Sequence, residues 1–258
     1  MKISAVIIAF NEEAKIGDAI RSLDWVDEVL VVESESTDRT KQIAEKLGAK
    51  VITRPWPGFS AQKQFGTDAA ENDWIFSLDC DERVSDELRR EIIALKEDAA
   101  RPRASGYRIP RLTYYMGQPI RHSGWYPDWQ LRLFDRRKGN WKEVLIHESV
   151  TMEPGAIVEK LNGNILHYSI DSPAQHHEML GKRYAPLAAQ QMYEHGRRTN
   201  ALKIAFAGPI AFASTYLLKG GFLDGMPGFS IARFAAHHAF LKHILLRELQ
   251  NGDAPADR

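Results

Sequence analysis

The first eighty residues alternate between short apolar runs and segments with helical spacing. The apolar runs are rich in β-branched residues, which is typical of strands buried on both faces of a parallel sheet. Between them, apolar residues recur every three or four positions, as in amphipathic helices. The predicted strands are residues 3–10, 28–33, 50–54 and 74–78, and the predicted helices between them are 12–23, 39–47 and 60–70. This alternation predicts a doubly wound α/β sheet with right-handed crossovers.

The pattern changes after residue 100. A predicted helix at 85–100 is followed by short strands at 107–112, 131–135 and 165–168, separated by loops rich in Gly, Pro and aromatic residues. From residue 172 onward the spacing is helical. A chain of 258 residues has room for one large domain with a substantial C-terminal extension.

Polar side chains follow three of the predicted strands at the point where each one ends. Asn11 and Glu12 follow the first strand, Glu33 closes the second, and Asp79 and Asp81 follow the fourth. The carboxyl ends of strands are where open α/β sheets bind ligands. Crowded carboxylates are costly to keep ionised, and a divalent cation such as Mg²⁺ or Mn²⁺ relieves that cost while holding substrate phosphates. The alternative is an acidic turn that leads into the next helix.

Charge is distributed unevenly along the chain, although the formal net charge is zero. Residues 1–100 carry 13 Lys/Arg and 21 Asp/Glu, whereas residues 176–247 carry 9 Lys/Arg and 3 Asp/Glu. The acidic half argues against a nucleic-acid partner, and the basic, apolar tail suggests a membrane surface. The single cysteine, Cys80, excludes an internal disulfide and fits a reducing compartment. The apolar run 3–10 lacks the features of a signal peptide and is interpreted as a strand.

The tail contains fifteen consecutive residues without a charge, 204–218, between Lys203 and Lys219. This run is shorter than the roughly 20 residues of a membrane-spanning helix. Gly208 and Pro209 are expected to break its helix near the start. We therefore expect a segment that lies in the headgroup region of an anionic membrane. The alternative is a buried helical hairpin packed on the catalytic domain or on a dimer mate. The histidines of the tail, including His176, lack ligand spacing and are expected on helix surfaces.

Several segments together resemble family 2 inverting glycosyltransferases, and most closely the β-1,4-glucosyltransferases of lipopolysaccharide inner-core assembly. The resemblance covers about residues 3–250 and is carried by 5–13 (AVIIAFNEE), 31–40 (VVESESTDRT), 58–63 (GFSAQK), 77–82 (SLDCDE), 123–134 (SGWYPDWQLRLF) and 146–148 (IHE). It implies a GT-A fold, a nucleotide-sugar donor, for which a UDP-hexose is expected, and a divalent metal. We expect a catalytic domain at 1–170, with a nucleotide-sugar half at 1–100 and an acceptor half at 101–170. The apolar run and the basic charge of the tail predict a helical, membrane-associating extension at 171–258.

The resemblance also implies roles for single residues. The segment that contacts the nucleotide is matched by Phe10, Asn11 and Glu12. Glu33 matches the acidic residue that holds the uracil or ribose, and Lys63 matches a basic position near the diphosphate. In the D-x-D motif, Asp79 matches the ribose-side carboxylate and Asp81 matches the metal ligand. Asp79 and His167 are further candidate metal ligands. The family usually has Asp where Glu33 stands and often Gly where Glu35 stands, so the donor is less well defined than the reaction class.

An inverting transfer needs one general base, which deprotonates the acceptor hydroxyl. Glu148 matches the family's acidic position opposite the D-x-D motif, and Asp128 is the second candidate. Either carboxylate is alternatively a structural ion-pair partner, for instance of Arg132. Trp125 and Trp129 offer flat faces for sugar stacking or for packing under a loop.

The sequence therefore predicts a metal-dependent inverting glycosyltransferase. We expect it to move glucose or another hexose from a UDP-sugar to a lipid-linked glycan acceptor, of the lipopolysaccharide core or a related surface glycan. The expected location is cytoplasmic, peripheral on the inner face of the cell membrane. The alternatives are a nucleotidyltransferase, against which the acidic segment after the first strand counts, and a non-catalytic nucleotide-sugar or glycan-binding protein. Whether the chain forms a homo-oligomer is left open.

Overall fold

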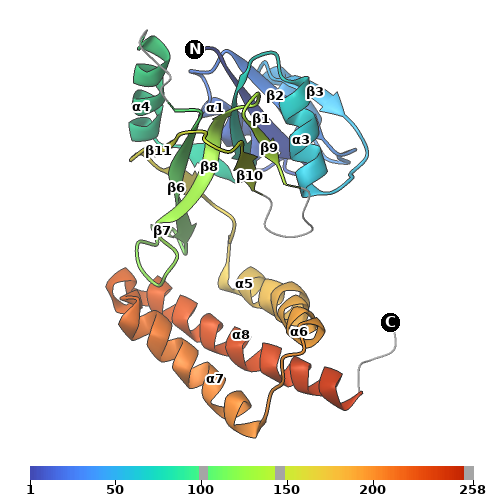
Figure 1. Cartoon of the computed structure of the whole chain (residues 1–258), viewed down its shortest axis with the longest axis vertical. Coiled ribbons are helices and arrows are strands. Elements are labelled where there is room, and N and C mark those ends of the chain that lie inside the picture. Colours follow the sequence, from blue (N-terminus) through green and yellow to red (C-terminus); the bar gives the residue numbers. More distant parts are fainter. Residues whose placement is uncertain (99–103, 143–148, 253–258) are drawn as a thin grey trace. The chain divides into compact units, whose positions relative to one another are not determined.

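The computed structural model describes residues 1–98, 104–142 and 149–252. The chain divides into two compact units, each described by itself below (Figure 1). Unit 1 comprises Met1–Leu112 and Asp128–His167, and unit 2 comprises Thr113–Pro127 and the chain from Tyr168 onward. The division into functional domains expected near residue 170 stays a prediction.

Unit 1 is built on the parallel strands expected from the sequence. β1 (Ile3–Ala9) lies between β2 (Glu28–Glu33) and β4 (Trp74–Asp79), and β3 (Lys50–Thr53) pairs with the outer edge of β2. All of these pairs are parallel. The doubly wound parallel core is therefore confirmed.

An antiparallel extension continues the sheet beyond β4. β8 (Asp128–Asp135) pairs antiparallel with β4 and with β6 (Gly106–Tyr115), and the strand order is β3-β2-β1-β4-β8-β6-β12-β5. The outer strands are β12 (Ile165–His167) and β5 (Glu82–Val84). The remaining strands, which the sequence did not predict, are β7 (Gln118–Pro119), β9 (Gly139–Trp141), β10 (Val150–Met152) and β11 (Val158–Lys160).

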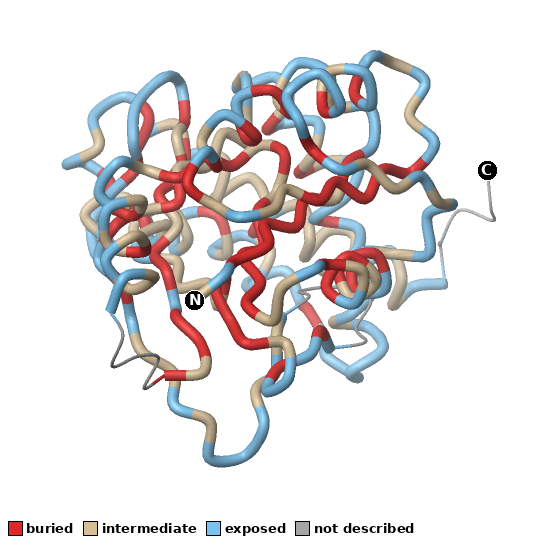
Figure 2. The backbone as a smooth tube through the Cα atoms, turned by 90° about the horizontal axis from the view of Figure 1, so that it is seen from above, coloured by how far each residue is buried: buried red, intermediate tan, exposed pale blue. Residues whose placement is uncertain are grey.

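The helices of unit 1 cover both faces of the sheet because successive side chains of a strand point to opposite faces. One face packs on a core cluster that includes residues of α1 (Ile16–Arg21) and α4 (Asp86–Glu97). The other face, with Val6 of β1, belongs to a second cluster that includes the end of α3 (Phe59–Ala69). α2 is Thr40–Lys46. Six of the seven residues of β1 are buried, and buried residues are red in Figure 2.

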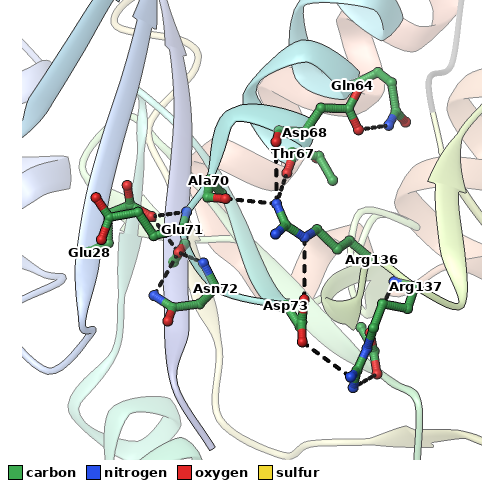
Figure 3. Close-up of polar contacts among 12 residues, drawn as sticks. Glu28, Gln64, Thr67, Asp68, Ala70, Glu71, Asn72, Asp73, Arg136 and Arg137 are labelled. Carbon is green, nitrogen blue, oxygen red and sulfur yellow. Dashed lines mark hydrogen bonds and ion pairs between the residues drawn. The ribbon is translucent and has the colours of Figure 1, made fainter.

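α3 is held closely against the sheet at Gly66. A Cβ at this position would lie 2.5 Å from Val6 Cγ1 and 3.1 Å from Val32 Cγ2, so only glycine permits this approach. At the end of the helix, Arg136 Nη1 donates to the carbonyl oxygens of Thr67 at 3.0 Å and Ala70 at 2.7 Å (Figure 3). A cation at this end satisfies carbonyl groups that the helix leaves free. These contacts fix the position of α3 on the sheet.

Unit 2 is mostly helical. α5 (Pro173–Met179) and α6 (Ala185–Glu194) are joined by a π-helical turn, and α7 (Ala201–Ala213) is followed by a second π-helical turn, Ser214–Leu218. α8 (Gly225–Asn251) follows and lies side by side with α7 (Figure 1). Asp224 accepts hydrogen bonds from the backbone N–H groups of Arg121 at 3.1 Å and His122 at 3.0 Å, which fastens the loop before residue 125 to the start of α8.

The expected helix break at Gly208 and Pro209 is wrong, because α7 runs through both residues. Gly208 is buried, and a Cβ there would lie 3.3 Å from the carbonyl oxygen of Ala236 on α8. Close packing of α7 on α8 therefore accompanies the helix across the proline, and tertiary packing outweighs the lost backbone hydrogen bond.

The apolar run of unit 2 is helical but little buried. Residues Ala201–Leu218 have a mean hydropathy of 1.5, and 11% of them are buried. Within the described part of the chain this is one helix long and apolar enough to cross a membrane, which by itself is weak evidence of a span. Most of this run is therefore exposed within one chain, and both the membrane-surface interpretation and the hairpin packed on the catalytic domain or on a dimer mate stay predictions.

Candidate active site at the carboxyl ends of the parallel strands

The polar residues expected to form a site lie at neighbouring strand ends. In the sheet register, Ala9 of β1 pairs with Glu33 of β2, and Ile8 of β1 pairs with Asp79 of β4. The carboxyl ends of these three strands therefore meet at one edge of the sheet. Asn11 and Asp81 follow two of them within two residues.

The loop after β1 is fastened to the loop after β2. Asn11 has a φ of +53°, its backbone N–H donates to Ser36 Oγ at 3.1 Å, and its Oδ1 accepts from the Thr37 N–H at 2.9 Å. The Glu12 N–H donates to Thr40 Oγ1 at 2.7 Å. Phe10 is 55% exposed beside this loop. The structure brings the expected nucleotide segment to the strand ends, and its contacts with a nucleotide stay a prediction.

Glu33 is buried at the end of β2. Its Oε2 accepts a hydrogen bond from the Ser36 N–H at 2.8 Å. Burial favours the protonated form, but hydrogen bonds from Thr53 and Ser36 outweigh it and lower the pKa of Glu33. An ionised Glu33 thus orders the loop after β2, and its predicted contact with the uracil or ribose remains a prediction.

Lys63 is carried to the site by α3, one turn before Gly66. Its side chain is buried, and its Nζ lies 2.9 Å from Asp79 Oδ1 and 5.0 Å from the centroid of the Trp141 ring. The expected position near a diphosphate is thus occupied by a lysine that contacts the first carboxylate of the D-x-D motif.

Asp79 lies between two cations. Arg132 Nη2 is 2.9 Å from Asp79 Oδ2, on the side away from Lys63. Burial would raise the pKa of Asp79, but the Lys63 ammonium and the Arg132 guanidinium outweigh it and hold this pKa well below its usual range. These contacts favour the ionised form of Asp79, and both of its carboxylate oxygens contact protein cations.

Glu82 is a central residue of the site that the sequence reasoning did not identify. It is fully buried, and its Oε2 accepts the backbone N–H of Asp79 at 3.0 Å. Its Oε1 lies 2.8 Å from Arg132 Nη2 and 3.4 Å from Arg111 Nη1. The available signal was Arg132 itself, a charge inside the apolar strand 131–135, which requires a buried partner.

The second candidate base, Asp128, is held by protein groups. Its Oδ2 lies 2.7 Å from Arg111 Nη2, and its Oδ1 accepts from Gln130 Nε2 at 2.7 Å. Arg111 and Asp128 are directly opposite each other on β6 and β8, which explains why Arg111 takes the place expected for Arg132. The first candidate base, Glu148, lies outside the described residues, as does His147.

Asp81 and His167 come together because β12 pairs with β5. His167 Nε2 lies 3.5 Å from Asp81 Oδ2, and both side chains are partly exposed. Burial favours the protonated acid, but the hydrogen bond and the charge of His167 outweigh it and lower the pKa of Asp81. Of the three expected metal ligands, Asp81 and His167 therefore lie together. The oxygens of the third, Asp79, contact Lys63 and Arg132.

The donor set fits a hard divalent cation. Among residues 1–98, 104–142 and 149–252, no group of three or more His, Cys, Asp or Glu side chains is arranged to hold a metal alone. Mg²⁺ usually takes only one or two carboxylates and completes its coordination with waters and substrate phosphates. One carboxylate and one imidazole therefore suit a metal that binds together with a diphosphate.

The aromatic residues expected near an acceptor are packed against protein groups. The ring of Trp125 lies 5.8 Å from that of Tyr115 within unit 2. Lys160 Nζ lies 4.4 Å from the Trp129 ring centroid within unit 1. Both contacts agree with the alternative that these aromatic rings pack against protein groups. Stacking of a sugar on either ring stays a prediction.

The chain is similar to proteins that transfer sugars. The model of the family described as Glycosyl transferase family 2 matches residues 4–152. LpsC, a lipopolysaccharide core biosynthesis glycosyltransferase of Rhizobium meliloti, is 32% identical over 252 residues, covering 93% of this chain and 90% of LpsC. An uncharacterized glycosyltransferase of Rickettsia typhi is 33% identical over 258 residues, covering 96% of this chain and 87% of that protein. Among solved structures, TarS of S. aureus aligns with a TM-score of 0.49 and 15% identity, over 98% of this chain and 92% of that chain.

Proposed function

Because this chain belongs to glycosyltransferase family 2 and has the GT-A type of sheet, we propose that it transfers a hexose from a UDP-sugar to a surface-glycan acceptor. Glucose is the first sugar to test, and the lipopolysaccharide core is the first acceptor. The acceptor class is supported by the similarity to LpsC along most of both chains. The sugar and the nucleotide are supported by the sequence resemblance.

One observation carries the proposal for the site. Asp81 and His167 form a partly exposed donor pair at the strand ends, directly beside an Asp79 that two cations keep ionised. Such an arrangement supports binding of a metal-diphosphate complex, because the metal ligands remain accessible while the neighbouring charge is neutralised by the protein. Asp81 and His167 would hold the Mg²⁺ or Mn²⁺.

A bound metal would neutralise the negative charge that develops on the departing nucleoside diphosphate. The protein's own residues would perform the remaining steps. Lys63 and Arg132 hold Asp79 in one ionised position, where its carboxylate can accept hydrogen bonds from the ribose side of the donor. Glu148 would take the proton of the acceptor hydroxyl while that oxygen attacks the anomeric carbon from the opposite face, which inverts the configuration in a single displacement.

The enzyme would work at the inner face of the cell membrane, as a peripheral protein. The support is the exposed apolar helix of unit 2 together with the excess of basic residues between 176 and 247. A lipid-linked acceptor would then share a surface with the enzyme.

Release of nucleoside diphosphate from a panel of nucleotide sugars tests the proposal. Wild type, Asp81→Ala, Glu148→Gln and the control Glu45→Ala, an exposed carboxylate on α2, are compared with membrane-extracted glycolipid as acceptor. Each protein is assayed after chelation and after readdition of Mn²⁺ or Mg²⁺. We expect metal-dependent turnover of one sugar by wild type and by Glu45→Ala.

The two site variants should fail in different ways. Asp81→Ala should lose metal-dependent donor binding and turnover together. Glu148→Gln should still bind donor while transfer falls by about 10²–10⁴-fold, the usual contribution of a general base. Turnover that survives chelation, or Asp81→Ala that behaves like Glu45→Ala, would overturn the metal site. The absence of turnover with every sugar and metal would overturn the proposed substrates.

A further inference from the structure

A groove in unit 2 is lined by both basic and apolar side chains. It has a volume of about 580 Å³ and is lined by residues of α6, α7 and α8 and of the segment that joins α6 to α7. This volume lies within the roughly 300–1,000 Å³ of small-molecule sites. The groove belongs entirely to unit 2, so it is separate from the residues assigned to donor binding in unit 1.

Four cations surround this groove. Arg197 and Arg198 precede α7, Lys203 lies in its first turn, and Lys242 comes from α8. None of the four forms an ion pair with a carboxylate of residues 1–98, 104–142 or 149–252, although Lys203 Nζ donates to the carbonyl oxygen of Arg198 at 3.0 Å. Like charges gathered without a counter-ion repel one another, so this cluster favours an anionic ligand. Arginine binds phosphate through two parallel N–H groups.

The apolar part of the lining continues onto an exposed stripe of α7. Phe206 and Ile210 line the groove and are 56% and 64% exposed, and Leu202, four residues before Phe206, is 69% exposed. Side chains four residues apart lie on the same helix face. The exposed apolar residues continue past the end of α7 at Leu217 and Leu218. The groove therefore places four cationic side chains next to an exposed apolar surface.

We propose that this groove binds the phosphate headgroup of an anionic membrane phospholipid while the α7 stripe lies among the neighbouring acyl chains. This inference rests on the membrane contact in the proposed function and names the residues and the lipid chemistry that would make it. A phospholipid matches both halves of the groove, because its phosphate is anionic and its tails are apolar. A second copy of the chain matches less well, since it would bring two unpaired cationic clusters together.

Sedimentation of the full-length protein with lipid vesicles tests the proposal. One set of vesicles contains phosphatidylcholine alone, and the other contains phosphatidylcholine with phosphatidylglycerol. The variant Arg197→Gln/Arg198→Gln removes two charges from the groove. The matched control Arg183→Gln/Arg233→Gln removes two charges from exposed helix positions of unit 2 outside the groove.

We expect wild type to prefer the phosphatidylglycerol vesicles. The groove variant should lose affinity for them by roughly 10- to 30-fold, which corresponds to about one favourable contact per cation. The control should lose about threefold or less, since screening limits distant charges. Equal losses in both double variants would overturn the groove as a site and leave only diffuse attraction to the membrane.

Two further arms separate the other occupants. Phe206→Gln/Ile210→Gln, at two exposed positions, should weaken binding to both kinds of vesicle if the stripe enters the lipid.

If inorganic phosphate binds to the protein in a way that depends on Arg197 and Arg198, while vesicles do not bind, the groove is a soluble-phosphate site. If sedimentation velocity shows a dimer that Phe206→Gln/Ile210→Gln dissociates, the stripe is an interface between copies. Either result overturns the proposal. The vesicle assay contains no nucleotide sugar, so its result does not depend on glycosyl transfer. Failure of the lipid-binding proposal and failure of the proposed function are therefore distinguishable.

Discussion

The charged residues of the two units are arranged in opposite ways. At the strand ends of unit 1, Lys63, Arg111 and Arg132 each have a carboxylate oxygen within 2.9 Å. At the groove of unit 2, four cations have no carboxylate partner among the residues that the structure describes. Paired charges hold a protein in one arrangement, whereas unpaired charges of one sign attract a ligand.

This contrast separates positioning from binding. In unit 1 the ion pairs immobilise the groups around Asp81 and His167 and leave these two proposed metal ligands partly exposed. In unit 2 the cations contribute little to the fold and remain available for an anion. Substitutions should therefore affect stability strongly in the first region and weakly in the second.

The largest effect is expected from Arg132→Met. This change leaves Glu82 fully buried and Asp79 without one of its two cations, and breaking a buried pair in this way costs about 3–5 kcal/mol of unfolding free energy. Urea unfolding measures the loss. The same substitution at the exposed Arg198 should cost about 0.5 kcal/mol or less.

A double variant sharpens that result. Glu82→Gln combined with Arg132→Met removes the buried charge of Glu82 and should recover part of the stability lost in Arg132→Met alone. If Arg132→Met and Arg198→Met unfold at the same urea concentration, the contrast between paired and unpaired cations is wrong.

The next effect concerns pH and a buried histidine of unit 2. Burial lowers the pKa of His176 to about 4 from its ordinary 6.5. Below pH 6.5 the unfolded chain therefore binds a proton that the folded chain does not, and stability falls as the pH drops towards 4. The loss reaches about 3 kcal/mol, at about 1.4 kcal/mol per pH unit.

Urea unfolding between pH 7 and pH 4 tests this linkage. His176→Phe keeps an aromatic ring beside Tyr115 and Phe234 but removes the titrating group, so its stability should depend less on pH than that of wild type over this range. His177→Gln, at the exposed neighbouring position, should follow wild type. Identical pH dependence in all three proteins would show that His176 is not the group responsible.

His176 also shows where sequence reasoning succeeds and where it stops. Strands β1 and β2 were predicted within one residue of their observed bounds, because burial on both faces leaves a continuous local pattern. The surface position expected for His176 is wrong, since it is buried against Tyr115, 61 residues away in sequence, and Trp125. Burial of that kind has no local signature.

The candidate site divides in the same way. The strand-end position of Asp79 and Asp81 follows from the alternation of elements, and it was predicted. The pairing of Arg132 with Glu82 joins residues fifty positions apart, so neither the partner nor the geometry could be read from sequence. The short strands β5, β7 and β9–β11 have three residues or fewer, which is too short for a periodic pattern to appear.

A smaller effect is expected where α3 approaches the sheet. Gly66→Ala places a Cβ 2.5 Å from Val6 Cγ1, and such overpacking costs about 1–3 kcal/mol. Because Lys63 lies one turn earlier on α3, the displaced helix should also weaken the Lys63–Asp79 contact and lower donor affinity. Gly181→Ala in unit 2, with nothing within 4 Å of the new Cβ, should be neutral or slightly stabilising.

Val6→Ala introduced together with Gly66→Ala should recover donor affinity, because it makes room for the new methyl group. Thermal unfolding and donor titration measure the two quantities separately. If Gly66→Ala is as stable as Gly181→Ala, the close approach of α3 does not constrain the site.

The smallest effect is expected at two residues with left-handed backbone. Glu35, in the loop after β2, has a φ of +58°, and Met116, in the turn between β6 and β7, has a φ of +52°. A non-glycine residue there is strained by about 1–2 kcal/mol, but glycine also loses more entropy on folding, so each glycine substitution should stabilise by only about 0.5 kcal/mol. A left-handed backbone favours glycine, which fits the expectation from the family resemblance for the position of Glu35.

The two positions separate strain from ligand contact. Glu35→Gly and Met116→Gly should raise the thermal midpoint by similar small amounts, since the backbone conformation is nearly the same. Glu35 follows β2 at the candidate site of unit 1, whereas Met116 belongs to unit 2, so a change in donor affinity confined to Glu35→Gly would show that this carboxylate contacts the donor. Equal donor affinity in both variants would mean that Glu35 is a solvated charge tolerated at a strained position.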